Sequence, residues 1–358
     1  MKTHFAFVRA PALEGNGLSN DDPADSRAPQ VSVLISCFDG AAWLQESISS
    51  VLNQTFEDFE LILVDDGSAD RSLQIMEQAQ STDDRVVLIR KEHSGLTDSL
   101  NVGLAAAKGR WIARLDSDDL CEPDRLAEQV SYAERHDVVL VGSGFVEIDV
   151  AGNTVKIGRY PGSHSALVRR LIKSRGFFPH SSAFFNREAA VKAGAYNPLF
   201  LKSQDRDLWL RLAETGRLNC ISRSLVKVRK HAQSVSNSAV GHSQFVYGTA
   251  ASACYLLRQA GVDDPSADAD GRAWDGFLGW IAENDLTKIA LSRRETWGQL
   301  RGRYLGQSNR VRGLWVFAFG LVSSGMAMAL LREKFFGLSL PARLSANWAK
   351  KSCAVSSA

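Results

Sequence analysis

Two short acidic clusters are the residues of this sequence whose types and spacing could support chemistry. Asp65 and Asp66 begin one cluster, and residues 116–119 (DSDD) place three carboxylates within four positions. Neighbouring carboxylates repel one another unless solvent, hydrogen-bond donors or a cation offsets their charge. Mg²⁺ usually binds through one or two carboxylates together with substrate phosphates, so the D-x-D pattern could hold a metal and a diphosphate. Taken alone, each cluster is also typical of a solvated turn or a helix N-cap.

Both clusters follow predicted strands of a parallel sheet. Apolar, β-branched runs predict strands at 31–37, 59–64, 86–90 and 111–115, and segments of helical periodicity separate them. Strands that alternate with helices are typical of βαβ units. Such sheets bind ligands at the carboxyl ends of their strands, which is where both clusters lie.

The pattern changes after about residue 137. We expect short strands at 138–141, 144–148 and 182–185, a helix at 205–214 and a strand at 218–228. From about residue 242 the chain is expected to be mostly helical. The sequence thus predicts a flexible leader over residues 1–29, an α/β unit over 30–237 and a helical, basic region over 238–358.

Composition excludes several classes of protein. The chain has 358 residues, 45% of them hydrophobic and 23% charged, which fits a globular protein rather than a disordered or collagen-like chain. A net charge of +2 argues against a dedicated nucleic-acid binder. The five cysteines include no C-x-x-C pair, so a disulfide framework or a zinc ribbon is not expected.

The balanced total hides a basic C-terminal region. From Lys288 onward the sequence has twelve basic residues and two acidic ones, a local charge of +10, which leaves −8 for the rest. Residues 314–331 carry no charge, and two interpretations of them stay open: a buried or interfacial helix, or a single membrane span. Basic residues flank both ends, against the positive-inside tendency of a span. Arginine pairs in this region fit an anionic lipid surface.

Several ordered sequence blocks resemble the family 2 glycosyltransferases, which have a GT-A fold. The blocks are VSVLISCFDG, then SISSVLNQTFEDFELILVDDGSADRS, then HSGLTDSLNVGLAAAKGRWIARLDSDDLCEPDRLAEQ, and later PHSSAFFNREAAVKAGAYNP, SQDRDLWLRL and VRKHAQSVS. The resemblance covers roughly residues 31–237. It implies a Rossmann-like, mostly parallel sheet flanked by helices, with residues 30–137 as the nucleotide-sugar half and 138–237 as the acceptor half.

The resemblance also implies which residues bind the donor. Asp65 would accept a hydrogen bond from a uracil or thymine ring, with Asp66 beside it. Backbone around Cys37 and Phe38 would flank the base, and Asp116 would reach the ribose or a metal ion.

The metal and the catalytic base follow from the same resemblance. Asp118 would coordinate Mg²⁺ or Mn²⁺ at the diphosphate, and His231 falls where some members supply a metal or phosphate contact. Asp205 falls where the family keeps its catalytic base. Gln204 replaces the glutamate that often precedes this base, and Asp207 is the competing candidate.

Two further residues depart from the usual pattern of the family, and the role of one histidine stays open. Ser36 stands where the first strand usually ends in proline, and Asp39 where asparagine is common. His180 either lines the acceptor site or packs after the Pro179 turn.

The resemblance implies an inverting glycosyltransferase. It would move a sugar from a UDP- or dTDP-sugar to a hydroxyl of a glycan or lipid-linked acceptor, in surface polysaccharide or glycolipid synthesis. One base and one metal suit a single in-line displacement. The alternatives are a sugar nucleotidyltransferase, a glycoside hydrolase and a non-catalytic nucleotide-sugar binding module. We expect a cytoplasmic protein that is peripheral at the inner face of the cell membrane and binds no nucleic acid.

Overall fold

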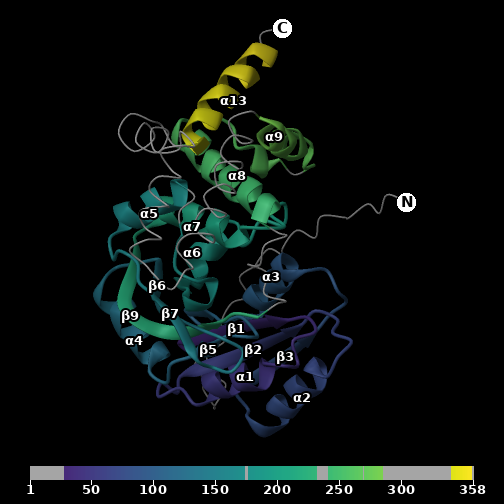
Figure 1. The fold of residues 1–358 in the computed structure, drawn as a ribbon, viewed down its shortest axis with the longest axis vertical. Coiled ribbons are helices and arrows are strands. Elements are labelled where there is room, and N and C mark those ends of the chain that lie inside the picture. The colour runs from purple at the N-terminus through teal and green to yellow at the C-terminus, as the bar shows by residue number, and fades with distance from the viewer. Residues whose placement is uncertain (1–27, 174–175, 232–240, 269, 285–339, 357–358) are drawn as a thin grey trace, which may run out of the picture.

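The computed structural model describes residues 28–173, 176–231, 241–268, 270–284 and 340–356. Within these residues a nine-stranded mixed sheet forms the body of the molecule. Helices cover it, and three helices from the C-terminal region stack at one end (Figure 1). The predicted α/β class, with helices after the sheet, is confirmed.

The N-terminal part of the sheet is parallel. Its strands lie in the order β3-β2-β1-β4, and each matches the sequence prediction to within one residue. They are β1 (Val31–Cys37), β2 (Phe59–Asp65), β3 (Val86–Arg90) and β4 (Trp111–Arg114). All residues of β1, β2 and β4 are buried, as expected for strands that are covered on both faces.

Alternate residues of these strands build two hydrophobic cores. Val33 and Ile35 of β1 pack on one face of the sheet, and Leu34 packs on the other. The first core includes residues of α1 (Leu44–Leu52), α2 (Ser72–Thr82) and α4 (Arg125–Arg135). The second includes residues of α3 (Leu96–Ala106), α5 (His164–Ile172) and α7 (Gln204–Thr215).

The rest of the sheet is mixed. The order continues from β4 through β8, β6 and β9 to β5, and β7 pairs with β6. β8 runs antiparallel to both of its neighbours, β4 and β6, while β6 and β9 are parallel. These strands are β5 (Leu120–Cys121), β6 (Leu140–Ile148), β7 (Thr154–Gly158), β8 (Phe184–Asn186) and β9 (Leu218–Arg229).

Two expectations in this part are corrected. The sequence predicts separate strands at 138–141 and 144–148, but β6 is continuous through Gly142 and Gly144. A Cβ atom on Gly142 would lie 2.2 Å from the Phe178 ring, so this glycine makes room for an aromatic side chain rather than ending the strand. The strand predicted at 182–185 is shifted, because the 3-10 turn η1 (His180–Ser182) precedes β8. The helix predicted at 205–214 is α7.

The later helices pack on one another and on α7. They are α8 (Gly241–Gln259), the 3-10 turn η3 (Pro265–Ala267), α9 (Arg272–Glu283) and α13 (Leu340–Ser356). The short helix α6 (Arg187–Lys192) comes earlier in the chain, directly after β8. Ser345 of α13 donates a hydrogen bond to the carbonyl of Ala253 in α8 at 3.0 Å, and the rings of Trp348 and Phe277 lie 4.8 Å apart. None of the helices in the described residues is long and apolar enough to cross a bilayer. The uncharged stretch 314–331 lies outside the described residues.

Candidate active site

The carboxyl ends of β1, β2 and β4 meet at one edge of the sheet. β1 lies between β2 and β4 and is parallel to both. Cys37 ends β1 opposite Asp65, which ends β2, and Asp116 lies two residues beyond the end of β4. The chain order reverses at β1, with β2 and β3 on one side and β4 on the other. Open α/β sheets bind ligands outside the strand ends at such a switch point.

Side chains of Asp39 and Asp70 join the loops that follow β1 and β2. Asp39 has a left-handed backbone (φ 49°), and its Oδ1 accepts hydrogen bonds from the N–H groups of Ala69 (2.8 Å) and Asp70 (3.2 Å). Oδ2 of Asp70 accepts one from the N–H of Ala41 at 3.0 Å. An asparagine side-chain oxygen could accept the same bonds as Asp39, so the departure at this position keeps the loop geometry.

Asp66 fixes the loop that follows β3. Its carboxylate accepts hydrogen bonds from Nζ of Lys91 (2.5 Å) and from the N–H groups of Ser94 (3.0 Å) and Gly95 (2.9 Å). Burial raises the pKa of Asp66, but these hydrogen bonds outweigh it and hold the pKa below its ordinary value. Its side chain is 3% exposed, so Asp66 holds the surrounding loop in place and offers almost no surface to a ligand.

An exposed aromatic pair lies beside the end of β2. Phe38 is 49% exposed, and its ring centroid lies 4.0 Å from that of His93, at an angle of 32°. Gly67 permits this approach because its φ is +75° and a Cβ atom there would lie 2.8 Å from the backbone nitrogen of His93. Asp65 next to it is buried, with Oδ1 accepting from the N–H of Ser68 at 3.2 Å. Sequence reasoning gave His93 no role; its only signal is that it opens the HSGL block.

A fully buried arginine holds Asp116. Nη2 of Arg114 lies 2.6 Å from Oδ1 of Asp116, and the hydroxyl of Ser181 donates to Oδ2 at 2.6 Å. Burial raises the pKa of Asp116, but the positive charge of Arg114 brings it below its ordinary value. Sequence reasoning missed Arg114 because one charged residue in a buried strand gives no pattern.

Asp118 contacts the end of β9. Its Oδ2 lies 2.8 Å from Nε2 of His231, and its backbone oxygen accepts a hydrogen bond from Nε of Arg229 at 3.2 Å. The Arg229 guanidinium also lies 4.3 Å from the ring centroid of Trp43 and pairs with Glu46 at 2.7 Å. The structure therefore brings the predicted pair Asp118 and His231 together, over a gap of 113 residues in sequence.

Asp119 is a structural residue. It is 3% exposed, and its Oδ1 accepts a hydrogen bond from the N–H of Arg229 at 2.8 Å. Its Oδ2 lies 2.5 Å from the hydroxyl oxygen of Ser181. Burial and the charges of Asp116 and Asp118 raise the pKa of Asp119 well above its ordinary value. The helix N-cap expected for this position is not formed by Asp119, because α4 begins after Asp124.

Asp205 lies in the first turn of α7 and is half-buried. Its Oδ1 accepts a hydrogen bond from the N–H of Arg206 at 2.8 Å. The N-cap residue of α7, Ser203, has a left-handed backbone (φ 56°), which sets the direction in which the helix starts. A carboxylate at a helix N-terminus is favoured by the helix dipole.

The competing candidate, Asp207, is buried in an ion pair. It is fully buried, and its Oδ2 lies 2.5 Å from Nη2 of Arg211, which also binds the backbone oxygens of Ala193 and Ala195. Burial raises the pKa of Asp207 against the opposing charge of Arg211. Asp207 therefore fixes α7 to the turn after α6 and does not face a substrate.

The charges of Asp116 and Asp205 both act on His180 and Tyr196. Nε2 of His180 is 2.9 Å from the hydroxyl of Tyr196. Burial and the charge of Arg114 lower the pKa of His180 to about 4, although Asp205 and Asp116 both act to raise it. His180 is therefore neutral near pH 7, and it lies within electrostatic reach of both carboxylates.

The donor set fits a hard divalent cation. The side chains of Asp116 and Asp118 are 37% and 28% exposed, and carboxylate oxygens with one imidazole suit Mg²⁺ or Mn²⁺. As the side chains stand, no group of three or more His, Cys, Asp or Glu in the described residues surrounds a metal position. Asp116 is turned to Arg114 and Asp118 to His231, so coordination would require these carboxylates to turn.

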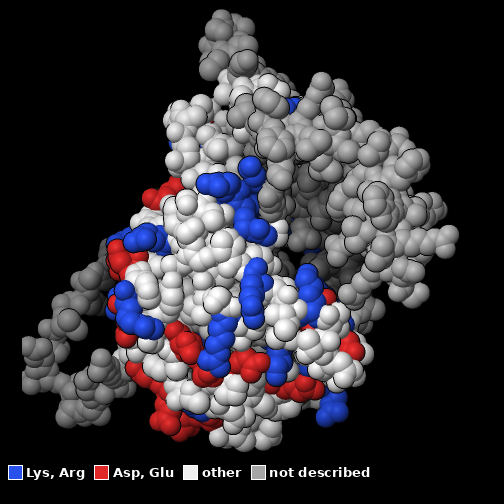
Figure 2. Space-filling view, turned by 60° about the vertical axis from the view of Figure 1, so that its left-hand side comes forward, with Lys and Arg blue, Asp and Glu red and all other residues white. Residues whose placement is uncertain are grey.

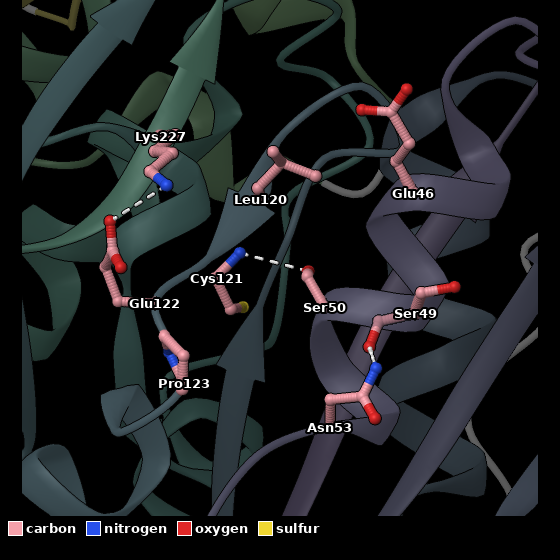
Figure 3. Close-up of a pocket in the computed structure, with 9 residues that line it drawn as sticks. All are labelled: Glu46, Ser49, Ser50, Asn53, Leu120, Cys121, Glu122, Pro123 and Lys227. Atoms are coloured by element: carbon pink, nitrogen blue, oxygen red, sulfur yellow. Dashed lines mark hydrogen bonds and ion pairs between the residues drawn. The ribbon is translucent and has the colours of Figure 1, made fainter. Parts of the chain in front are cut away.

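A surface hollow of about 460 Å³ is lined by none of the predicted donor, metal or base residues (Figure 3). It is bordered by α1, β5 and β9. Within it, the N–H of Cys121 donates to Ser50 at 3.0 Å, and Lys227 pairs with Glu122 at 3.4 Å. These contacts anchor the D-x-D turn to α1 and β9. The lining residues are Glu46, Ser49, Ser50, Asn53, Leu120, Cys121, Glu122, Pro123 and Lys227.

Comparison with protein families and curated relatives gives one consistent result. A family model described as Glycosyl transferase family 2 matches residues 32–194. The O-antigen biosynthesis glycosyltransferase WbnJ of Escherichia coli is 31% identical over 218 residues, which cover 59% of this chain and 84% of WbnJ. The amylovoran biosynthesis glycosyltransferase AmsE of Erwinia amylovora is 31% identical over 210 residues, covering 57% of this chain and 78% of AmsE.

Solved structures share the fold. S. aureus TarS 1-349 in complex with UDP-GlcNAc superposes with a TM-score of 0.54 at 17% identity, covering 64% of this chain and 66% of that one. The complex of TarS 1-349 with UDP gives a TM-score of 0.51 at 16% identity, covering 64% and 65%. Each match spans slightly less than two thirds of the solved chain. At this identity the likeness concerns the fold.

Proposed function

This chain belongs to glycosyl transferase family 2, and we propose that it transfers a sugar from a UDP- or dTDP-sugar to a hydroxyl of a glycan or lipid-linked acceptor, with inversion at the anomeric carbon. The relatives named for O-antigen and amylovoran biosynthesis support a role in surface polysaccharide or glycolipid synthesis. The TarS complexes with UDP and UDP-GlcNAc support a nucleotide-sugar donor.

The donor would lie at the carboxyl ends of β1, β2 and β4. Phe38 and His93 offer an exposed aromatic surface for the base, and Asp65 is the nearby group that can accept a hydrogen bond from a uracil or thymine N–H. The backbone of Cys37 and the carboxylate of Asp66 hold these groups in place. Asp116 would reach the ribose or a metal ion.

Asp116, Asp118 and His231 are the residues that would hold Mg²⁺ or Mn²⁺. When bound, the metal offsets the negative charge that develops on the leaving nucleoside diphosphate. Arg114 keeps Asp116 ionised, and Arg229 fixes the backbone of Asp118. Both arginines thus orient the two carboxylates before the donor binds.

Asp205 would act as the general base. An acceptor hydroxyl is a weak nucleophile near neutral pH, and a positioned carboxylate can take its proton as the new bond forms. In one displacement the acceptor oxygen bonds to the anomeric carbon, the bond from that carbon to the diphosphate oxygen breaks, and the proton moves to Asp205. A single displacement inverts the configuration at that carbon.

The observation that carries this proposal is the position of η1 between the two halves. Ser181 bonds Asp116 directly, and the charges of Asp116 and Asp205 both act on the adjacent His180. A donor-side carboxylate and a candidate base thus face the same buried histidine. We accordingly assign residues 30–137 to the donor half, 138–237 to the acceptor half and 238–358 to a separate C-terminal region.

A donor panel tests the proposal against its alternatives. The full chain is incubated with UDP- and dTDP-sugars and Mn²⁺, and released nucleoside diphosphate is measured. A glycosyltransferase releases UDP or dTDP from one or few donors. A nucleotidyltransferase instead requires a sugar phosphate and releases pyrophosphate, and a binding module retains the donor without release. A glycoside hydrolase needs no nucleotide. Release from none of the donors would refute the proposal.

The C-terminal charge supports a location at the inner face of the cell membrane. Twelve basic and two acidic residues follow position 287, and anionic lipids attract such segments. A peripheral protein at the cytoplasmic face would meet a lipid-linked acceptor directly. The alternative of one span over 314–331 concerns residues outside the described part of the chain.

A further inference from the structure

One stretch of the sequence has only basic charges. Between Asp149 and Glu188 there is no acidic residue, while seven lysines and arginines occur. Strand β7 and helix α5 belong to this stretch, whereas β6, the other strand of the hairpin, precedes it and carries Glu147 opposite Lys156. We call the exposed and partly exposed residues around them the hairpin–helix face, which consists of Val150, Val155, Ile157 and Arg159 in and next to the hairpin, Arg169 and Arg170 of α5, and Lys173 at the C-cap of α5. In Figure 2, Lys and Arg side chains gather in a band on the side of the molecule that carries these elements.

The hairpin also exposes aliphatic side chains. The described residues contain seven exposed large hydrophobic side chains, and three of them are Val150 (55%), Val155 (59%) and Ile157 (58%). Val155 and Ile157 lie on the same face of β7, since side chains alternate along a strand. β7 pairs only with β6 in the described sheet, so it is an edge strand. Edge strands that must stay in water usually carry charges at such positions.

Aromatic rings connect the hairpin to α5. Nζ of Lys156 lies 5.9 Å from the centroid of the Phe145 ring, and that ring lies 6.1 Å from the ring of Tyr160. The guanidinium of Arg170 lies 5.4 Å from the Tyr160 ring. Hairpin and helix therefore form one packed unit rather than two independent elements.

Two exposed cations of α5 are available to a partner. Arg169 and Lys173 are four residues apart, which places them on the same side of the helix. Both are exposed, and within the described residues neither belongs to an ion pair. The one acidic residue at the hairpin turn, Asp149, is engaged locally, because its Oδ1 accepts from the N–H groups of Ala151 and Asn153 at 2.9 Å.

The hairpin–helix face borders the candidate active site at two points. The N–H of Lys230, next to His231, donates to the carbonyl of Ile148 at the hairpin turn at 2.9 Å. Nη1 of Arg206, next to Asp205, donates to the carbonyl of Leu171 in α5 at 2.6 Å. A partner bound to this face would therefore lie beside the acceptor side of the site.

We propose that the hairpin–helix face docks on an anionic phospholipid bilayer. Aliphatic side chains of the edge hairpin enter the headgroup region, while lysines and arginines stay at the negatively charged surface. A second copy of this chain is a poor occupant, because two such faces would oppose like charges. A soluble acidic polymer would leave the three aliphatic side chains in water. The inference concerns binding alone and rests on the proposed function only for the view that the acceptor is lipid-linked.

Vesicle partitioning of the full chain tests the proposal. Vesicles of phosphatidylcholine are prepared with and without phosphatidylglycerol, and the bound fraction is measured by sedimentation across a lipid titration. Each basic residue near an anionic surface contributes roughly a fivefold increase in partitioning, so the pair Arg169→Gln/Lys173→Gln should weaken binding roughly 30-fold. The pair Val155→Thr/Ile157→Thr keeps β-branched residues and should weaken binding severalfold on the same vesicles.

The pair Arg90→Gln/Lys108→Gln is the matched control. It removes the same charge from Arg90 at the end of β3, which pairs with Glu77 at 2.7 Å, and from the exposed Lys108 before β4; β3 lies at the opposite edge of the sheet. We expect it to change partitioning less than twofold. Equal effects of the two Gln pairs, or equal binding to both kinds of vesicle, would overturn the proposal. The proposal would also be overturned if the Arg169→Gln/Lys173→Gln variant lost binding to a soluble acidic polysaccharide but kept its binding to vesicles, because the face would then be a glycan site.

Nucleoside diphosphate release on a water-soluble acceptor separates this inference from the proposed function. Variants of the face should keep the wild-type rate in that assay. A chain that binds anionic vesicles through this face and releases no UDP or dTDP would leave the docking surface intact and remove the proposed function.

Discussion

Replacing Asp205 with asparagine should separate catalysis from folding. The substitution keeps the shape of the side chain, and an amide oxygen can still accept the hydrogen bond from the N–H of Arg206 that Oδ1 now accepts at 2.8 Å. What it removes is the ability to take a proton. Because Asp205 is half-buried and is not in a salt bridge within the described residues, we expect the melting temperature to change little.

The size of the kinetic effect follows from general base catalysis. A positioned base contributes about 10²–10⁴ in rate, so kcat should fall by that factor, equivalent to roughly 3–5 kcal/mol in the activation free energy. The donor contacts assigned to Asp65, Phe38 and Asp118 lie on other elements. The Kd for the nucleotide sugar should therefore change less than twofold.

Asp207→Asn is the matched control, two residues along the same helix. It leaves the Arg211 guanidinium without its countercharge in a site where Asp207 is fully buried. Breaking a buried pair costs about 3–5 kcal/mol, and the lower end applies here because Arg211 keeps the backbone oxygens of Ala193 and Ala195 as acceptors. We expect a fall in melting temperature of roughly 10 °C and a near-normal kcat per folded molecule.

The assay is UDP or dTDP release at saturating donor, read together with thermal unfolding of each variant. Asp205→Asn should lose rate and keep stability, and Asp207→Asn should lose stability and keep rate. The opposite outcome, a stable but inactive Asp207→Asn variant beside a mildly affected Asp205→Asn variant, would show that the base is misassigned.

Three further predictions concern the metal, a buried histidine and the C-terminal charge. Asp118→Asn should abolish metal-dependent transfer with little change in melting temperature, because the side chain is 28% exposed; activity of this variant that survives in EDTA-treated buffer would contradict the metal assignment. Folding lowers the pKa of His180 from 6.5 to about 4, so the unfolded chain binds a proton at this residue more readily than the folded protein does. The protein should therefore lose stability as the pH falls from 6.5 towards 4. His180→Gln should reduce the difference between the urea midpoints of unfolding at pH 7 and at pH 5. The full chain should pellet with membranes and be partly released by high salt, and replacing Arg293, Arg294, Arg301 and Arg303 with glutamine should increase the released fraction; wild-type protein found wholly in the supernatant would refute this.

The parallel part of the sheet is readable from sequence because its residues are buried on both faces. Continuous apolar runs such as 59–64 have few alternatives to a central strand, and β1 and β3 match their predicted bounds. β6 is harder, since Gly142 and Gly144 look like breaks. Their purpose is visible only in space: Gly142 makes room for the ring of Phe178, and a Cβ atom on Gly144 would lie 2.9 Å from the backbone oxygen of Ser222.

The candidate site is also predictable from the sequence only in part. The carboxylates Asp65, Asp116 and Asp118 follow recognisable strands, so their shared edge can be predicted. The sequence does not predict that Arg114 and Arg229 orient these carboxylates, because each is a single charged residue whose partner is set by the fold. The resemblance already favoured Asp205 over Asp207 as the base, and the structure adds that Asp207 is buried in a pair with Arg211.

Ser181 lies between two of the three aspartates of the DSDD sequence. The serine hydroxyl has one proton, yet its oxygen lies 2.6 Å from Oδ2 of Asp116 and 2.5 Å from Oδ2 of Asp119. Only one carboxylate at a time can accept that proton, so the two carboxyl groups compete for it. Burial and the charges of Asp116 and Asp118 raise the pKa of Asp119, while Arg114 lowers that of Asp116, so Asp119 is the first of the two to take up a proton as the pH falls.

The contacts of Asp116, Asp118 and Asp119 differ in burial and in partners. The Ser181 hydroxyl donates to Asp116, whose other carboxylate oxygen faces Arg114. Asp119 is 3% exposed, whereas the side chains of Asp116 and Asp118 are 37% and 28% exposed. Buried donors and a buried arginine thus offset the repulsion within the DSDD sequence at Asp116 and Asp119. Asp116 and Asp118 are therefore the two carboxyl groups of the cluster that a cation can reach from solvent.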